Sequence, residues 1–345
     1  MNRSWISSLQ EVDAIRVDSE RKFFSATHEE ILKGYTTDIY FVSAQEVLRH
    51  LKLEDTVVVA EIFPRQAGIL CGVEEVLHLL SENAVEVWSL EEGEKFEPKE
   101  VVMRIKGPYS QFGIFETPLL GILAHSSGWA TAAWECKQAA QNKTVISFGA
   151  RHVHPAVAPV MERAAMVGGA DGAACILGAK LAGKEPGGTM PHAVILIVGD
   201  TVVTGKAFVE VIPKKFSRVV LVDTFKDEAE EALRVAQFLK NDLDGVRLDT
   251  PDERGGVTPA LVEEVRERLR QAGFEGVKIV VSGGLNPERI ALMHDKVDIF
   301  GVGSYISGHP PIDMTMDIKE VAGQKVAKRG RIPGIISNPR LKRMK

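Results

Sequence analysis

Short apolar runs alternate with longer amphipathic stretches across the second half of the chain. The runs with the length and β-branched content of buried strands are residues 145–148, 173–176, 219–222, 246–248, 278–281 and 298–301. Helical spacing between them is clearest at residues 226–240 and 259–272. Alternating strands and helices predict a parallel sheet, and this many units without a Rossmann glycine fingerprint favour a (β/α) barrel.

The first hundred residues follow a different pattern. Residues 1–50 are polar and helical in character, with an amphipathic segment at residues 43–51. The segments that follow are strands at residues 56–60, 85–88 and 101–105 and a helix at residues 72–80. They predict a small α+β domain with a mainly antiparallel sheet.

Three further segments set the expected domain organisation. Residues 116–140 form a long helix rich in small residues, which suits a linker between domains or a subunit contact. Residues 312–331 read as one more strand and a basic turn that return to the first domain, whereas residues 194–198 fit strand or helix equally well. We therefore expect a first domain of residues 1–120, joined by roughly residues 312–345, and a barrel domain of residues 121–311.

Composition narrows the class of protein. The chain has 345 residues, 45% of them hydrophobic and 26% charged, and a net charge of −5, which gives no support for a nucleic-acid partner. Its three cysteines form no CxxC pair, so neither a zinc site nor a disulfide framework is expected. Without a signal-peptide pattern or an apolar run of membrane-spanning length, we expect a cytoplasmic enzyme without a membrane partner.

Two glycine-rich turns follow successive strands near the end of the predicted barrel. Ser282, Gly283 and Gly284 follow the first of these strands, and Gly301, Gly303 and Ser304 follow or end the second. Glycine lets backbone N–H groups approach an anion closely, and turns at this place in a barrel often hold phosphate. Ordinary tight turns are the alternative.

Polar residues also follow the other predicted strands, where barrel enzymes carry their chemistry. They are Arg151, His152, His154, Thr189, His192, Asp223, Thr224, Arg247, Asp249 and Thr250. Arginines suit phosphates or carboxylates, and carboxylates suit ribose hydroxyls or Mg²⁺ held through water. Simpler roles remain open: Arg247 with Asp249 as a structural ion pair, and Asp223 with Thr224 as a helix cap. A metal site at the two histidines near residue 153 is disfavoured, because no third ligand has suitable spacing.

In chain order, these motifs resemble those of nicotinate phosphoribosyltransferases. The matching segments are TDIY at residues 37–40, FGARHVHP at 148–155, DG at 171–172, GTMPH at 188–192, DTF at 223–225, GVRLDT at 245–250, SGGL at 282–285 and FGVGS at 300–304. The resemblance covers roughly residues 30 to 335. It implies an α/β fold, with an N-terminal open-faced α/β sandwich and an irregular, incomplete TIM-like barrel. It also implies a homodimer or larger homo-oligomer with shared active sites.

The implied reaction joins nicotinate to phosphoribosyl diphosphate, giving nicotinate mononucleotide and pyrophosphate in NAD salvage. By this resemblance, Ser282, Gly283, Gly284, Gly301, Gly303 and Ser304 hold the 5-phosphate. Arg151 faces pyrophosphate, and Asp223 and Asp249 face the ribose, with Mg²⁺ on the diphosphate. Arg247 and Thr189 orient the carboxylate, with Tyr40 near the ring.

For three residues the resemblance implies substrate binding without naming the part of the substrate, and it implies one optional cofactor. His154, Thr224 and Thr250 are further substrate-binding candidates. His192 matches a histidine that family members phosphorylate when ATP hydrolysis is coupled to synthesis, so ATP is an optional cofactor.

Two other functions compete with this expectation. Quinolinate phosphoribosyltransferase shares the two-domain plan, but a dicarboxylate substrate calls for more Arg and Lys than Arg151 and Arg247 provide. A barrel isomerase or aldolase acting on a phosphorylated sugar is the second. An aldolase needs a Schiff-base lysine, and no lysine stands at the strand ends named above.

Overall fold

The structure is a computed structural model that describes residues 4–345, and its chain divides into two compact units. Unit 1 comprises the chain up to Gly128 together with Pro310–Lys345, and unit 2 is Trp129–His309. The predicted boundary at residue 120 falls inside helix α6 (Glu116–Ala140), which begins in unit 1 and ends in unit 2. The predicted division into domains stays a prediction. The first three residues of the predicted first domain lie outside the described part of the chain.

Unit 1 contains a six-stranded sheet with strand order β13-β12-β1-β5-β3-β14. Its strands are β1 (Val57–Pro64), β3 (Glu86–Ser89), β5 (Met103–Pro108), β12 (Met314–Val321), β13 (Gln324–Lys325) and β14 (Lys342–Arg343), and neighbouring strands pair in antiparallel fashion. A separate pair joins β2 (Gly68–Ile69) to β4 (Lys95–Phe96). The strand predicted after residue 312 is β12, which pairs with β1 and so returns to the first sheet.

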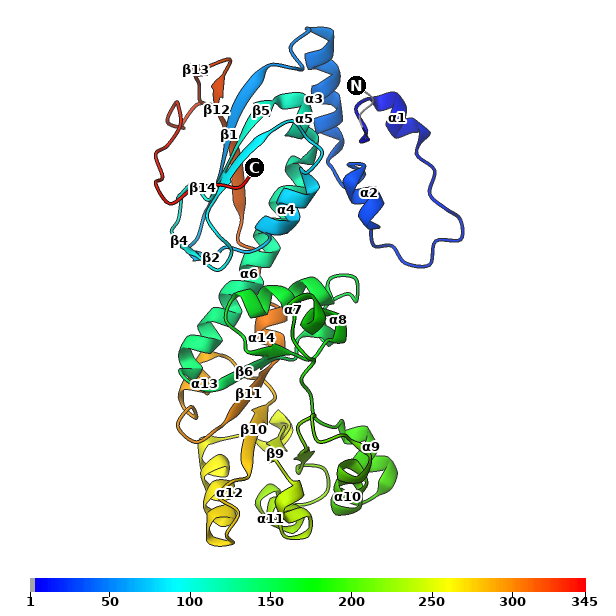
Figure 1. Cartoon of the computed structure of the whole chain (residues 1–345), viewed down its shortest axis with the longest axis vertical. Coiled ribbons are helices and arrows are strands. Elements are labelled where there is room, and N and C mark those ends of the chain that lie inside the picture. Colours follow the sequence, from blue (N-terminus) through cyan, green and yellow to red (C-terminus); the bar gives the residue numbers. More distant parts are fainter. Residues whose placement is uncertain (1–3) are drawn as a thin grey trace. The chain divides into compact units, whose positions relative to one another are not determined.

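Helices of unit 1 cover one side of this sheet (Figure 1). They are α3 (Ile39–His50), α4 (Val73–Leu79) and α5 (Tyr109–Phe112), with α1 (Leu9–Ala14), α2 (His28–Leu32) and the 3₁₀ turn η1 (Gly113–Phe115) nearby in sequence. Phe41, Val76 and Phe112 from the covering helices pack with sheet residues such as Ile62 and Ile105 in one buried cluster. This is the predicted open-faced sandwich.

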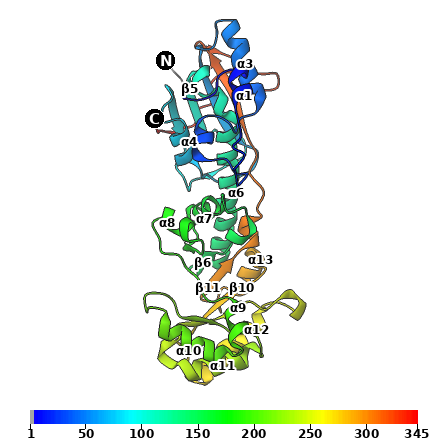
Figure 2. The ribbon, with the colours of Figure 1, turned by 90° about the vertical axis from the view of Figure 1, so that its right-hand side faces the viewer.

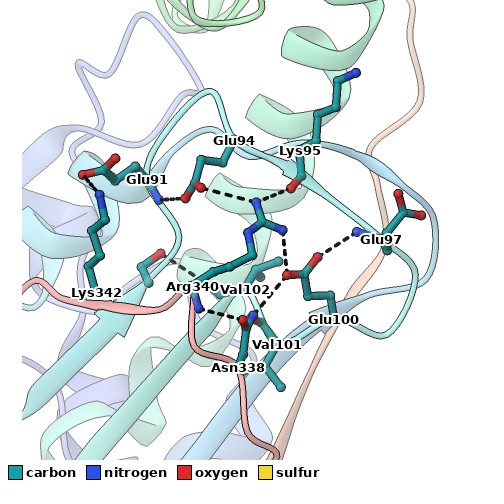
Figure 3. A network of polar contacts seen from close by, with 11 residues as sticks. Glu91, Glu94, Lys95, Glu97, Glu100, Val101, Val102, Asn338, Arg340 and Lys342 are labelled. Carbon is teal, nitrogen blue, oxygen red and sulfur yellow. Dashed lines mark hydrogen bonds and ion pairs between the residues drawn. The ribbon is translucent and has the colours of Figure 1, made fainter.

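The C-terminal segment is fastened to the same unit by polar contacts (Figure 3). The Asn338 side-chain amide donates to Glu100 and to the Val101 carbonyl, and Arg340 pairs with Glu94 and Glu100. Further along, the Lys345 ammonium donates to carbonyls at the end of α4 and in the turn after it. These contacts place the last strand, β14, against β3.

Unit 2 is built on a parallel sheet with strand order β7-β6-β11-β10-β9-β8. The strands are β6 (Thr144–Ser147), β7 (Gly172–Ala173), β8 (Val219–Leu221), β9 (Gly245–Leu248), β10 (Lys278–Ser282) and β11 (Ile299–Val302). All five pairs of neighbouring strands in this sheet are parallel, with β7 and β8 at its two edges. The predicted α/β fold with an incomplete barrel is thus confirmed.

Helices follow nearly every strand of unit 2. They are α7 (Ala158–Val167), α8 (Ile176–Leu181), α9 (His192–Val198), α10 (Thr201–Val211), α11 (Glu228–Leu239), α12 (Pro259–Gln271), α13 (Pro287–Ala291) and α14 (Ser304–Ser307), with 3₁₀ turns η2 (Ala150–His152), η3 (Lys240–Asp242) and η4 (Asp252–Arg254). Residues 194–198, whose pattern fitted strand or helix equally well, are helical and belong to α9. Helices α10, α11 and α12 lie side by side in both views (Figures 1 and 2).

Local chemistry explains where several of these helices begin. Asp227 caps α11 by accepting hydrogen bonds from the Ala229 and Glu230 N–H groups, and Thr258 caps α12 through the Leu261 N–H. A proline follows Thr258 at the first helical position, where its missing N–H costs nothing. Within residues 4–345, helices long and apolar enough to cross a membrane are absent.

Candidate active site

The carboxyl ends of the parallel strands in unit 2 enclose a cavity of ≈ 260 Å³. Its lining residues are Phe148, Arg151, His152, Arg247, Asp249, Ser282, Gly283, Gly284, Gly301, Gly303 and Ser304. All of them except Phe148 and His152 are site residues predicted from the sequence. Strands β6, β9, β10 and β11 therefore bring together segments separated by more than a hundred residues.

Arg247 connects three sides of this site. Its guanidinium donates to Ser282 Oγ at 3.1 Å, to Thr189 Oγ1 at 2.5 Å and to Asp249 Oδ2 at 2.9 Å. The ring of Phe148 lies 5.9 Å below the guanidinium carbon. Ser282 Oγ in turn donates to Asp249 Oδ1 at 2.6 Å, so the ion pair predicted between Arg247 and Asp249 belongs to a closed network. Such a network holds a planar fork ready for an anion.

The two glycine turns need glycine for different reasons. Gly283 and Gly284 adopt φ values of +87° and +57°, which disfavour any residue with a side chain. At Gly301 and Gly303 the reason is space: an added Cβ would lie 2.4 Å from the Phe148 ring and 2.9 Å from His152 Cε1, respectively. Backbone is thereby exposed to the cavity from β10 and β11, as a phosphate cradle requires.

His192 and Asp223 face each other beside the Arg247 network, with His192 Nε2 3.1 Å from Asp223 Oδ2. Burial raises the pKa of Asp223, while the hydrogen bond from His192 lowers it. Asp223 Oδ1 and Thr224 Oγ1 are both buried without a hydrogen-bond partner. Two unpartnered oxygens at a strand end suit a ligand hydroxyl or a hydrated cation.

Seven predicted residues lie outside the cavity lining: Thr189, His192, Asp223 and Thr224, which are described above, and three others. Tyr40 is exposed on α3 of unit 1, and His154 accepts a hydrogen bond from the Ala156 N–H on the surface of unit 2. Thr250 is buried and donates to Glu228 Oε1 at 2.8 Å. Their predicted substrate contacts stay predictions.

A buried carboxylate that sequence reasoning missed supports the turn carrying Arg151. Glu162 on α7 is fully buried and accepts hydrogen bonds from Ser147 Oγ and from the N–H groups of Ala150, Ala174 and Cys175. Burial raises the pKa of Glu162, and these hydrogen bonds oppose the shift. The signal was its position four residues after Ala158, on the buried face of the helix.

The residues present fit a cation carried in by a ligand. Among residues 4–345, no three His, Cys, Asp or Glu side chains gather into a set able to hold a metal ion. The free Oδ1 of Asp223, facing the negative charge of Asp249, fits water-mediated contact with Mg²⁺ on a diphosphate.

Fold and site together define a barrel enzyme of the phosphoribosyltransferase class, with glycine turns and an arginine–aspartate pair at the strand ends. Models of the quinolinate phosphoribosyl transferase N-terminal and C-terminal domains match residues 38–127 and 129–317. The chain belongs to the quinolinate phosphoribosyltransferase family.

Of three individual relatives, the two that are matched over most of their own length agree with this placement. The chain is 46% identical to a solved structure titled nicotinate-nucleotide pyrophosphorylase from Pyrococcus furiosus, with a TM-score of 0.88 over 91% of this chain and 82% of that one. A probable carboxylating nicotinate-nucleotide pyrophosphorylase of Archaeoglobus fulgidus is 28% identical over 75% of this chain and 93% of its own length. A nicotinate phosphoribosyltransferase of Mycobacterium tuberculosis is 30% identical over 66% of this chain, which spans about half of that relative's length.

The expected nicotinate phosphoribosyltransferase assignment is therefore wrong. Matches to both quinolinate domains, and the 46% identical pyrophosphorylase, overturn it. The reason is that most of the motifs used for it are those expected to hold phosphoribosyl diphosphate, a substrate that both enzyme types share. ATP coupling through a phosphohistidine at His192, and the ligase-type activity, belonged to that assignment and fall with it.

Proposed function

We propose that this protein transfers the phosphoribosyl group of phosphoribosyl diphosphate to quinolinate, releasing pyrophosphate and CO₂ and forming nicotinate mononucleotide. The family match over both units, with the P. furiosus pyrophosphorylase as a near relative, carries the proposal. The cavity supports it, because its cradles and arginines suit a phosphorylated, strongly anionic pair of substrates.

The proposed residue roles come from the resemblance of the motifs, and the positions of these residues in unit 2 are compatible with them. The residue 282–284 and 301–304 turns offer backbone N–H groups to the 5-phosphate, and Asp249 and Asp223 face the ribose hydroxyls. Arg151, which lines the cavity, would bind pyrophosphate, and Arg247, held by Thr189, would bind a pyridine carboxylate. Mg²⁺, bound through the diphosphate with Asp223 and Asp249 nearby, would neutralise the leaving group.

Little acid–base chemistry is needed for the ribosyl transfer. The ring nitrogen of the pyridine is already a nucleophile, and the transition state carries positive charge on the ribose. Catalysis then consists of positioning and electrostatic stabilisation, for which a rigid network of hydrogen-bonded charges is suited. The Arg247–Asp249–Ser282 network provides such rigidity.

A substrate comparison tests the proposal. Purified protein with Mg²⁺ and phosphoribosyl diphosphate is assayed for pyrophosphate release with quinolinate, nicotinate or nicotinamide, and CO₂ from carboxyl-labelled quinolinate is counted. We expect turnover with quinolinate alone, at one CO₂ per pyrophosphate. Release of pyrophosphate with nicotinate while quinolinate stays inert would refute it.

A further inference from the structure

His152 lies against the second glycine turn, and neither the resemblance nor the proposed function gives it a role. Its Cε1 would be 2.9 Å from a Cβ placed on Gly303, so only glycine lets the imidazole approach this closely. His152 Nδ1 lies 3.2 Å from Ser307 Oγ on α14, the helix that begins at Ser304. The ring thus forms a wall of the cavity beside the proposed phosphate cradle.

The hydrogen bonds around His152 define its protonation state. Ser307 Oγ donates its single proton to the Gly303 carbonyl at 3.2 Å, so it accepts from His152 Nδ1–H. On the other side, Arg151 Nε–H donates to His152 Nε2 at 3.3 Å. A ring that donates at Nδ1 and accepts at Nε2 is neutral. Burial, and then the Arg151 charge, lower the pKa of His152, in agreement with this geometry.

The other charged groups around the ring are already paired, so they do not oppose one more positive charge on His152. Across the cavity, Arg247 is neutralised by Asp249 at 2.9 Å. From α7, Glu162 is committed to Ser147 and to N–H groups of the surrounding turns. From α14, only the Ser307 hydroxyl bonds to His152. Of the two arginines among the described residues that line the cavity, a phosphate dianion would therefore meet Arg151 without a paired carboxylate.

We propose that His152 is a proton-linked anion ligand of this cavity. When a phosphate dianion enters between the two glycine turns, His152 Nε2 gives up its bond from Arg151, takes one proton from solvent and donates it in a hydrogen bond to the anion. Arg151 Nε is released at the same moment and turns its donors to the same ligand. This inference deepens the proposed function and rests on it, since it takes the cavity to be a phosphate site.

The test uses sulfate, which remains a dianion across the relevant pH range and so adds no titration of its own. Calorimetric titrations at pH 7 in two buffers of different ionisation enthalpy give the number of protons taken up per sulfate bound. We expect a value approaching one for the native protein and for the control His294→Gln, whose histidine bonds to the Ala291 carbonyl instead. His152→Gln should bind sulfate more weakly and take up almost no proton.

The pH dependence of sulfate affinity is a second test. It uses the native protein, so its result does not depend on the folding of a variant. Above the pKa of free His152, sulfate affinity should fall by up to about tenfold per pH unit, because one proton is linked to binding. Binding without proton uptake, or uptake unchanged in His152→Gln, would overturn the inference.

These outcomes separate the inference from the proposed function. Proton-linked sulfate binding in a protein that does not turn over quinolinate refutes the proposed function and leaves the role of His152 standing. Quinolinate turnover with sulfate binding that takes up no proton does the reverse. Absence of sulfate binding at every pH removes the phosphate site and overturns the inference.

Discussion

At the scale of single residues, Arg247 is the side chain on which the candidate site depends most. Its donors meet Ser282, Thr189 and Asp249 in a fixed fork, which a lysine cannot reproduce. We expect Arg247→Lys to lower kcat/KM for quinolinate by about a hundredfold, or about 3 kcal/mol of transition-state stabilisation, despite the retained charge.

Steady-state kinetics with a thermal unfolding scan would check this expectation. The matched control is Arg268→Lys on α12, whose arginine pairs with Glu264 on the surface. A kcat/KM within threefold of the native value in Arg247→Lys would show that the fork is not required.

Glu162 is a positioning residue, since it touches the turn of Arg151 rather than the cavity. In Glu162→Gln, the amide group would face backbone N–H donors and leave at least one buried donor unpaired, a cost of about 1–3 kcal/mol. We expect the melting temperature to fall and KM for phosphoribosyl diphosphate to rise several-fold, with kcat changed less, because the Arg151 turn loosens.

Glu162→Asp, which keeps the acceptor charge, should recover part of the KM, and Glu210→Gln on the surface of α10 serves as the control. Lower stability with an unchanged KM would assign Glu162 a purely structural role.

The location of a site residue could be predicted where its place at a strand end decides it. The glycines and charged residues of the cavity could be found because strand ends meet at one edge of a parallel sheet. Glu162 and His152 were not assigned roles, since their importance depends on hydrogen bonds between segments distant in the chain. Substrate choice was predicted wrongly because most of the motifs concern a substrate that both enzyme types share, and because counting Arg151 and Arg247 does not separate a monocarboxylate from a dicarboxylate.

At the scale of elements, helix α6 begins with Glu116, whose burial disfavours the charged form of the carboxyl. Burial, with the Asp317 charge second, raises the pKa of Glu116 to about 7, against an opposing effect of Lys328. The folded protein therefore holds this proton between pH 4.5 and 7, where the unfolded chain has lost it. The contribution of Glu116 to the free energy of unfolding is therefore fully present below about pH 4.5 and is lost as the pH rises through 7.

Glu116→Gln should remove that dependence. Relative to the native protein, the variant is expected to gain nothing at pH 4.5 and about 2 kcal/mol at pH 8, allowing for partial exposure of the carboxyl. Urea unfolding at several pH values measures this gain. A pH-independent difference between the two proteins would mean that Glu116 ionises normally.

Elements were predictable where period and length agreed. The buried strands of unit 2 and helices such as α12 have unambiguous patterns, whereas the run at residues 194–198 has apolar residues at every position. Its helical form in α9 leaves Leu196 and Ile197 exposed, so burial could not have selected between strand and helix there.

At the scale of the whole molecule, the two units have different tasks. Every residue that lines the cavity belongs to unit 2, whereas the C-terminal segment is bound to the sheet of unit 1. Sequence patterning indicated the return of the chain to its first sheet but not the contacts that hold the tail there, because these join it to acidic residues distant in the chain. In fact Arg340 and Lys342 pair with acidic residues around β4 (Figure 3).

Stability and anion binding should therefore be separable by a change in that tail. Arg340 donates to Glu100 at 2.8 Å and to the Lys95 carbonyl at 2.7 Å, and it pairs with Glu94 at 3.3 Å. Its side chain is 40% exposed, and an exposed ion pair contributes little to stability. We therefore expect Arg340→Ala to lower the free energy of unfolding by only about 1 kcal/mol. Sulfate affinity and kcat/KM should remain those of the native protein, because the contacts of Arg340 named above lie within unit 1 and the cavity lining within unit 2. Arg329→Ala, in the exposed turn of the same tail, should change neither property. Weaker sulfate binding in Arg340→Ala at unchanged stability would show that the tail acts on the site, and the division of tasks between the units would be wrong.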